Sequence, residues 1–418
     1  MAPRDRHGEA MAPARCCIVG GGPAGMMLGF LLARAGVPVV VLEKHGDFLR
    51  DFRRDTVHPS TLDVMAELGL LDRFLARPHD EAHRLRAHIS GQEVGLADFT
   101  HLSTRCKFIA LMPQWDFLDF IRDEGERYPE FRLMLNTEAT GLVERDGRVV
   151  GVEVKTAEGV SQMACDLVVA ADGRRSVLRG AAGLVVRDIG APIDVLWMRL
   201  PKHPDDPDGS GGYIDAGHFM ATIDRTTYWQ CAYVIGKGGI AAIQARGIEA
   251  FRADVAAIVP PFADRVDQIA SWDDVKLLSV TVDRLETWWK PGLLCIGDAA
   301  HAMSPVGGVG INLAVQDAVA AANILRDVLL DPNESADAIT ALLPTVQARR
   351  EFPAKVTQAV QVAVQNRVLA PVLQGTAAKG KRFTVPWILR LAQRYPILQG
   401  IPAYAVGIGV RPEHVRKG

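Results

Sequence analysis

The chain has almost no net charge. Its 418 residues include 47 lysines and arginines against 49 aspartates and glutamates, a formal net charge of -2 at pH 7. Proteins whose main partner is a nucleic acid usually present an excess of basic residues. The balance therefore argues against a nucleic-acid partner.

Cysteine is scarce, and its spacing is irregular. The chain has six cysteines: Cys16, Cys17, Cys106, Cys165, Cys231 and Cys295. Most lie in apolar, strand-like runs, and no group of them has the spacing of a metal site. We expect reduced, buried thiols of a cytoplasmic protein, and no bound metal ion.

The N-terminal part also lacks a long apolar run. The apolar stretch 26–42 is interrupted by Arg34, Gly36 and Pro38, and it is too short to cross a membrane. Residues 1–13 have no apolar centre of the kind that a signal peptide needs. We expect a disordered leader at 1–13 and no transmembrane segment.

Glycine, by contrast, is concentrated where it has a function. The run Gly20-Gly21-Gly22-Pro23-Ala24-Gly25 follows an apolar stretch at 16–19 that is typical of a buried strand. A helical pattern follows, then a second apolar run at 39–42 that ends in Glu43-Lys44. A strand, a glycine turn, a helix, a strand and an acid are the parts of a dinucleotide site. In such a site Gly20 permits the turn, Gly22 admits a pyrophosphate and Gly25 lets the helix pack closely.

A similar sequence pattern recurs late in the chain. The apolar run 293–296 precedes Gly297-Asp298, and a glycine loop follows from Pro305 through Gly308 and Gly310 to Ile311 and Asn312. A long helix is predicted from Leu313 to about Leu330. A carboxylate and a glycine loop before a helix again indicate close backbone approach to a ligand.

Between these blocks the patterns predict two interleaved domains. The fold class expected is α/β, with a Rossmann-like dinucleotide-binding domain, a mostly antiparallel α+β substrate domain and a helical C-terminus. We assign 14–83, 112–185 and 286–335 to the first, 84–111 and 186–285 to the second, and 336–418 to the C-terminal region. The pair Asp146-Gly147 predicts a hairpin inside the first domain.

Three blocks together resemble a known family. They are 20–25 with Glu43, then Asp172-Gly173 through Arg179, then 297–312. Their order and separation resemble those of the single-component FAD-dependent aromatic hydroxylases, of which para-hydroxybenzoate hydroxylase is the best-known member. The resemblance extends over about residues 14 to 335.

The resemblance implies FAD as cofactor and roles for several residues. It places Gly20, Gly22, Pro23, Ala24, Gly25, Glu43 and Lys44 at the ADP part of FAD, and Arg53 and Gln114 near its pyrophosphate and ribityl chain. It further implies that Ala139 contacts adenine, that Asp172 contacts the cofactor and that Asp298 binds the ribityl chain. The loop with Pro305, Gly308, Gly310, Ile311 and Asn312 would then lie against the flavin ring, with the helix N-terminus facing its N1/O2 edge.

The activity implied is that of an oxidoreductase. NADPH or NADH would reduce FAD, and O₂ would then give a flavin C4a-hydroperoxide that hydroxylates an aromatic, phenolic or quinone-like ring. Two alternatives stay open: a flavin-dependent halogenase or isoprenoid-type reductase on the same scaffold, and a non-catalytic flavin-binding protein. The Trp-x-Trp-x-Ile-Pro signature of halogenases is not found, since Trp288-Trp289-Lys290-Pro291 differs from it.

The residues that contact the substrate are not identified by the sequence. Aromatic and polar side chains occur on predicted strands of the second domain, where a packing role is the more common one: Trp197, Arg199, Tyr213, His218, Tyr228, Trp229 and Tyr233. His58 and His301 lie in or beside flavin-lining segments, and neither is assigned to catalysis. The apolar C-terminus suggests internal packing, a dimer contact or a weak membrane-surface contact, and the protein is expected to be a monomer or homodimer.

Overall fold

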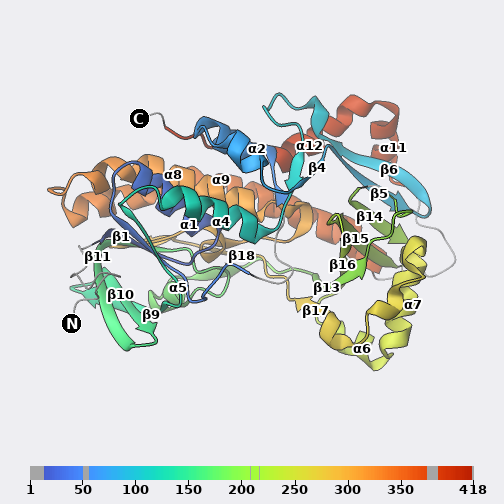
Figure 1. Ribbon diagram of the computed structural model, residues 1–418, viewed down its shortest axis with the longest axis horizontal. Coiled ribbons are helices and arrows are strands. Elements are labelled where there is room, and N and C mark those ends of the chain that lie inside the picture. The colour runs from blue at the N-terminus through green and yellow to red at the C-terminus, as the bar shows by residue number, and fades with distance from the viewer. Residues whose placement is uncertain (1–13, 50–55, 208, 216, 374–384, 417–418) are drawn as a thin grey trace.

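The computed structural model describes residues 14–49, 56–207, 209–215, 217–373 and 385–416. Arg53 lies outside these ranges, so its expected role at the cofactor stays a prediction. Figure 1 shows two β-sheets side by side, with long helices over one of them and the C-terminal helices over the other. The expected α/β class is confirmed, and the domain boundaries stay a prediction.

The first sheet is mostly parallel and has eight strands. In order across the sheet they are β19 (Trp289–Lys290), β20 (Leu293–Cys295), β11 (Gly159–Ala170), β1 (Ala14–Val19), β2 (Val39–Leu42) and β8 (Phe131–Met134), with β10 (Arg148–Thr156) on β11 and β9 (Glu138–Arg145) on β10. Asp146 and Gly147 both have positive φ and form the predicted hairpin turn between β9 and β10. The four central strands β20, β11, β1 and β2 end at one edge, where ligands of such sheets bind.

Alternating side chains bury the two faces of this sheet. Cys16 and Ile18 of β1 face a core formed with the helices, and Cys17 and Val19 face the β9–β10 hairpin. The helices against the first face are α1 (Pro23–Arg34), α2 (Pro59–Glu67), α3 (Leu71–Leu75), α4 (Gln114–Gly125), α8 (Gly310–Leu330) and α9 (Ala336–Val364). The short α5 (Val177–Ala181) packs on the second face.

Helix α8 differs from its expected start. It begins at Gly310 rather than Leu313, so Gly310, Ile311 and Asn312 form its first turn. Sequence periodicity missed this turn because glycine and asparagine have low helix propensity. By length and composition Val306–Leu330 is the one described helical stretch able to cross a membrane, but 78% of its apolar window is buried inside the protein.

The second sheet has seven strands and is antiparallel except at one pair. Its order is β17 (Lys276–Leu278), β13 (Ile193–Pro201), β16 (Tyr228–Gly236), β15 (His218–Asp224), β14 (Gly211–Asp215), β5 (Arg84–Ile89) and β6 (Gln92–Asp98), with β14 parallel to β5. Helices α6 (Ile240–Ala245) and α7 (Ile248–Ile258) lie at its outer side (Figure 1).

Two three-stranded sheets connect the larger ones. They are β3 (Thr56–Val57), β7 (Ile109–Leu111) and β4 (Asp80–Ala82), and β12 (Val186–Asp188), β18 (Asp283–Leu285) and β21 (His301–Ala302). Strand β7 lies within 84–111, which we assigned to the second domain, but it pairs with β3 and β4 rather than with the second sheet. Its all-buried Ile109-Ala110-Leu111 has no alternation that would show which sheet it joins.

The chain ends in short helices. After α9 come a π-helical turn at Gln365–Leu369, α10 (Ala370–Leu373), α11 (Trp387–Arg394) and α12 (Gly400–Gly407). Helices α11 and α12 pack on β6 and on the 3₁₀ helix η1 (Phe99–His101). The helical C-terminus expected from the sequence is confirmed.

Candidate active site

The glycine turn between β1 and α1 is closed on one side and open on the other. A Cβ atom at Gly20 would lie 2.4 Å from the carbonyl oxygen of Ala171, and one at Gly25 would lie 2.0 Å from that of Gly20. At Gly22, the N-cap of α1, a Cβ would meet no atom within 4 Å. Helix α1 has no side-chain cap, so its N-terminus faces this open space with its dipole. The turn has the form of an anion cradle.

Glu43 closes the cradle from the end of β2. Its Oε2 accepts a hydrogen bond from the Gly21 N–H at 3.0 Å, and its Oε1 accepts one from the His45 N–H at 3.0 Å. The carboxylate is thus oriented by the backbone at the place where a ribose would follow a pyrophosphate. Pro23 and Ala24 form the first helical turn, and Lys44 is exposed beside Glu43.

Asp172 follows β11 at the same sheet edge. Its Oδ2 accepts a hydrogen bond from the Val177 N–H at 2.9 Å, whereas its buried Oδ1 has no partner among the described residues. Burial raises the pKa of Asp172 against the opposing hydrogen bonds of Ser176 and the α5 backbone. A buried acceptor without a partner is costly, and a ligand donor would satisfy it.

Asp298 lies in a 3₁₀ turn directly after β20. Its Oδ2 is 3.6 Å from a guanidinium nitrogen of Arg174. Arg179, in contrast, is buried and binds both carboxylate oxygens of Asp283 and the carbonyl oxygen of Ala299. These contacts agree with a structural role for Arg179, and the expected role of Asp298 at the ribityl chain stays a prediction.

The loop before α8 approaches the chain near β3. Gly307 and Gly308 have φ of 80° and 65°, and a Cβ at Gly308 would lie 2.6 Å from the Thr56 hydroxyl, which donates to the Gly308 carbonyl at 3.0 Å. Pro305 starts this turn, and Gly310 and Ile311 begin α8 without a side-chain cap. The free helix N-terminus favours negative charge in front of it.

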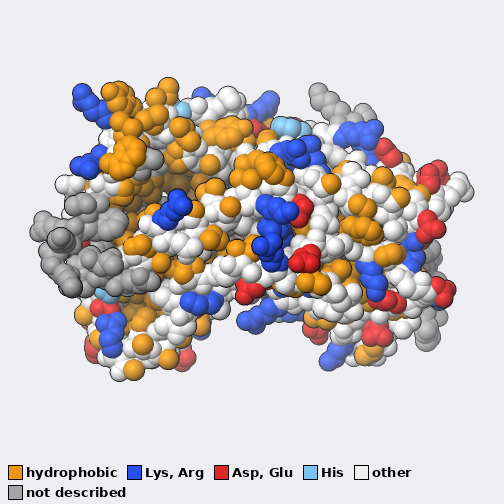
Figure 2. Space-filling view, turned by 180° about the vertical axis from the view of Figure 1, so that it is seen from behind, with side chains coloured by type: hydrophobic (Ala, Val, Ile, Leu, Met, Phe, Trp, Pro, Cys, Tyr) orange, Lys and Arg blue, Asp and Glu red, His pale blue; other side chains and the backbone are white. Residues whose placement is uncertain are grey.

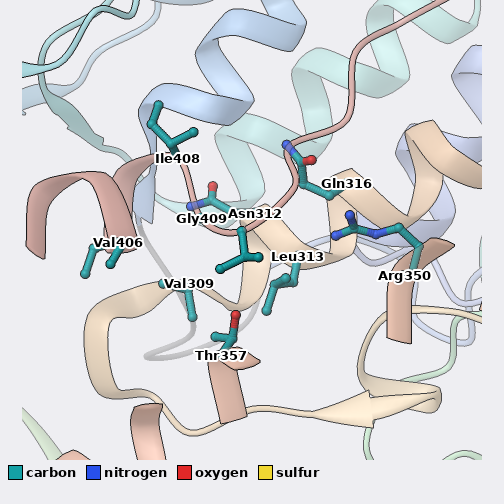
Figure 3. A pocket seen from close by; sticks show the side chains of 11 residues that line it. Val309, Asn312, Leu313, Gln316, Arg350, Thr357, Val406, Ile408 and Gly409 are labelled. Carbon is teal, nitrogen blue, oxygen red and sulfur yellow. The ribbon is translucent and has the colours of Figure 1, made fainter. Parts of the chain in front are cut away.

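Asn312 fixes α2 to α8. Its Oδ1 accepts hydrogen bonds from the His58 N–H at 3.3 Å and the Thr61 hydroxyl at 2.8 Å. Behind it, a cavity of about 20 Å³, the size of one water molecule, is lined by Asn312 and Gln316 of α8 together with α9 and the segment after α12 (Figure 3). The Oδ1 of Asn312 therefore joins the two helices, whereas its Nδ2 is buried without a partner among the described residues, and its expected contact with the cofactor stays a prediction.

Two predicted contacts lie further out. Gln114 is the first residue of α4, and Ala139 is a buried residue of β9 that pairs with Val154. The cofactor roles expected for both residues stay predictions. All six cysteines are free thiols.

A buried charge cluster behind the site was not predicted. Asp317 of α8 accepts hydrogen bonds from the Gly297 N–H at 3.0 Å, from the Arg350 Nε at 2.9 Å, and lies 2.6 Å from His301 Nε2. Burial alone would raise the pKa of Asp317, but His301 and Arg350 hold it below its usual value. The cluster fixes the backbone next to Asp298. An acid within an apolar helix was the only signal in the sequence.

Comparison with known proteins decides the family. A protein-family model described as "FAD binding domain" matches residues 14–360. 6-Methylpretetramide 4-monooxygenase of Streptomyces rimosus is 32% identical over 367 residues, 87% of this chain and 86% of that protein. The chain belongs to the FAD-dependent aromatic monooxygenases. Para-nitrophenol 4-monooxygenase of Pseudomonas sp. (strain WBC-3) is 27% identical, over 75% of this chain and 77% of that protein.

The fold of these monooxygenases also matches. PqsL of Pseudomonas aeruginosa in complex with 2-aminobenzoylacetate superimposes with a TM-score of 0.72 at 22% identity, over 88% of this chain and 99% of that one. The flavin-dependent halogenase, the reductase and the non-catalytic protein are not favoured by these relatives. The chain is an FAD-dependent enzyme with NAD(P)H as co-substrate.

The geometry fits FAD in a monooxygenase. The open side of Gly22, the oriented carboxylate of Glu43, the unsatisfied Oδ1 of Asp172 and the free N-terminus of α8 lie along the edge where FAD is expected. FAD, when bound, supplies the redox and oxygen-transfer chemistry. The protein's share is to bind and orient it, and to stabilise charge at the α8 N-terminus.

Proposed function

We propose that this monooxygenase hydroxylates a fused-ring, polyketide-type phenol with NADPH or NADH and O₂. The observation that supports this most directly concerns one face of the second sheet. This face packs with the glycine loop before α8 (residues 305–309), which we call the flavin loop. Trp197, Phe219 and Ala221 of the second sheet pack against the same apolar cluster as Val306 of that loop. The opposite face packs on α7.

This division separates the aromatic candidates of the sequence. Tyr213, Trp229 and Tyr233 belong to the cluster under α7, and Tyr233 bonds His218 there. These contacts support the packing interpretation for these side chains. Trp197 is on the other face, so it is the aromatic candidate for contact with a substrate.

The face toward the loop has a row of short side chains in register. Trp197 pairs with Ala232, Ala232 with Ala221, Ala221 with Gly212, and Gly212 with Ala87. Such residues rise little above the backbone of the strands. The ring of Phe219 approaches Gly212 and Ala87 is buried with Val372, so the partly exposed stretch of the row is at Trp197 and Ala221. We infer that a flat ring system wider than one phenol lies along this row.

Trp197 ends the row with a polar group. Its indole Nε1 is buried and has no hydrogen-bond partner among the described residues. An indole N–H only donates, so its natural partner is a carbonyl or phenolate oxygen of the substrate. The described face otherwise offers apolar contacts, which keep water from the reacting ring.

The relative with 32% identity supports the same class, since its name gives 6-methylpretetramide as substrate. We further propose a cytoplasmic location and a monomer or homodimer, which light scattering would distinguish. The choice between NADPH and NADH follows from comparing their rates of oxidation.

The test is a substrate panel with two variants. Ala221→Phe fills the row and should lower kcat/KM for fused-ring phenols about 100-fold. Trp197→Phe keeps a ring but removes the donor and should raise KM about 5-fold. The matched control is Ala256→Phe, the same change against the other face of the sheet. Equal loss in Ala221→Phe and Ala256→Phe, or preference of the native enzyme for single-ring phenols, would contradict the proposal.

A further inference from the structure

The C-terminal helices expose a large apolar surface that the active site does not use. We call Trp387, Leu391, Tyr395, Ile397, Ile401 and Tyr404 the tail patch. Their exposed fractions are 69%, 41%, 55%, 71%, 68% and 52%. Figure 2 shows these helices at the upper left, where apolar side chains gather with basic ones at their margin.

The patch is the outer face of helices that contact the second sheet on their inner side. In α11, Leu389 faces the cluster around β5 and β14, and Gln393 donates to the Glu93 carbonyl at 3.1 Å. Trp387, Leu391 and Tyr395, at spacings of four, point the other way. In α12, Ala403 is fully buried while Ile401 and Tyr404 are exposed. The patch is therefore not a frayed end.

Its charge is of one sign. Arg390 and Arg394 are exposed on α11 and form no ion pair within the described residues. The sequence has no Asp or Glu from residue 352 to 412. Of the cations in that stretch, Arg390 and Arg394 lie on α11, whereas Lys355 of α9 is paired with Glu351 at 2.7 Å. The neighbouring Glu93 of β6 is already paired with Arg86 at 3.1 Å.

We propose that the tail patch binds the surface of an anionic lipid membrane. Apolar and aromatic side chains at the centre with arginines at the margin are what interfacial helices use, and each basic side chain adds attraction to an anionic leaflet. The excess of positive charge at the margin complements an anionic surface, and a dimer on the same patch is one of the outcomes that the experiment separates. The groove of about 450 Å³ between Ile397, Ile401, Tyr404 and His101 gives an acyl chain room to enter.

The experiment is vesicle flotation of the FAD-loaded enzyme at physiological ionic strength. Vesicles of phosphatidylcholine alone are compared with vesicles that also contain phosphatidylglycerol. We expect binding to the anionic vesicles only. Arg390→Glu with Arg394→Glu should weaken it at least about 30-fold, and Trp387→Ser with Ile401→Ser should abolish it.

Matched controls are Val160→Ser with Leu277→Ser, which are exposed apolar positions elsewhere, and Arg34→Glu with Lys276→Glu, which are exposed cations elsewhere. Both controls should bind like the native enzyme, and every variant should retain its FAD. Binding to neither kind of vesicle, or unchanged binding by the tail variants, would overturn the proposal. A third result would also overturn it: the native enzyme binds no vesicles but forms a dimer, and the Trp387→Ser, Ile401→Ser variant is a monomer. A second copy of the chain would then cover the patch.

Discussion

His58 Nδ1 lies 2.8 Å from the carbonyl oxygen of Val406. A carbonyl only accepts, so Nδ1 bears the proton and Nε2 presents a lone pair toward the loop at Gly308. The contact joins the start of α2, beside the flavin loop, to the C-terminal helix α12, 348 residues along the chain. Helix α12 is thus fixed against the start of α2.

The burial of His58 predicts that the stability of the protein depends on pH. Burial lowers the pKa of His58 from 6.5 to about 4, against the weaker opposing effect of the Val406 hydrogen bond. Between pH 6.5 and pH 4 the unfolded chain therefore binds a proton at His58 that the folded protein does not bind. The free energy of unfolding decreases as the pH falls below 6.5. Between pH 7 and pH 4, the free energy of unfolding of the native protein should fall by about 3 kcal/mol more than that of His58→Gln. Urea unfolding of both proteins measures it, and parallel curves would refute the assignment.

Gly22→Val should remove FAD without unfolding the protein. The added side chain enters open space at the N-terminus of α1, where the pyrophosphate is expected. The measurement is FAD absorbance per protein after gel filtration, with circular dichroism for the fold. Gly236→Val, another glycine whose Cβ meets no atom within 4 Å, is the control and should retain its flavin. A yellow Gly22→Val protein would place the cofactor elsewhere.

Asp298→Ala should weaken FAD binding about 10- to 100-fold, the effect of losing one charge-assisted hydrogen bond. Asp298→Asn keeps an acceptor and should fall between the native enzyme and the alanine variant. Quenching of FAD fluorescence by the apoprotein gives the three dissociation constants. Equal constants would show that Asp298 serves only its neighbour Arg174, 3.6 Å away.

Arg350→Met should destabilise the fold by about 3–5 kcal/mol, because it leaves the buried carboxylates of Asp317 and Glu413 without their shared partner. Arg349 binds the same Glu413 oxygen at 2.7 Å, but its side chain is 44% exposed. Arg349→Met should therefore cost less than about 1 kcal/mol. Chemical denaturation compares them, and similar losses would mean that burial of the cluster is not what matters.

The parts of this fold that could be predicted from sequence are local. A glycine turn between an apolar strand and a helix, and an Asp-Gly pair between two strands, each determine a structure within a few residues. The start of α8 was missed because glycine and asparagine have low helix propensity. The sheet of β7 was missed because Ala110 pairs with Val57, which is far along the chain.

The same limit applies to the active site. The glycines and Asp298 belong to compact motifs, so they could be proposed as ligands from sequence alone. The bonds of His58 to Val406 and of Arg350 to Asp317 join segments that no pattern relates. The surroundings of Trp197 depend on which face of the second sheet is covered by α7. Only tertiary packing determines this.

As a monooxygenase, this chain transfers one oxygen atom from O₂ to an aromatic ring. Turnover of a fused-ring phenol with NAD(P)H under ¹⁸O₂, followed by mass spectrometry of the product, measures this transfer. We expect one ¹⁸O atom in each hydroxylated product and NAD(P)H oxidation that rises with substrate. NAD(P)H oxidation that yields only hydrogen peroxide with every aromatic compound, or a product whose oxygen comes from water, would contradict it.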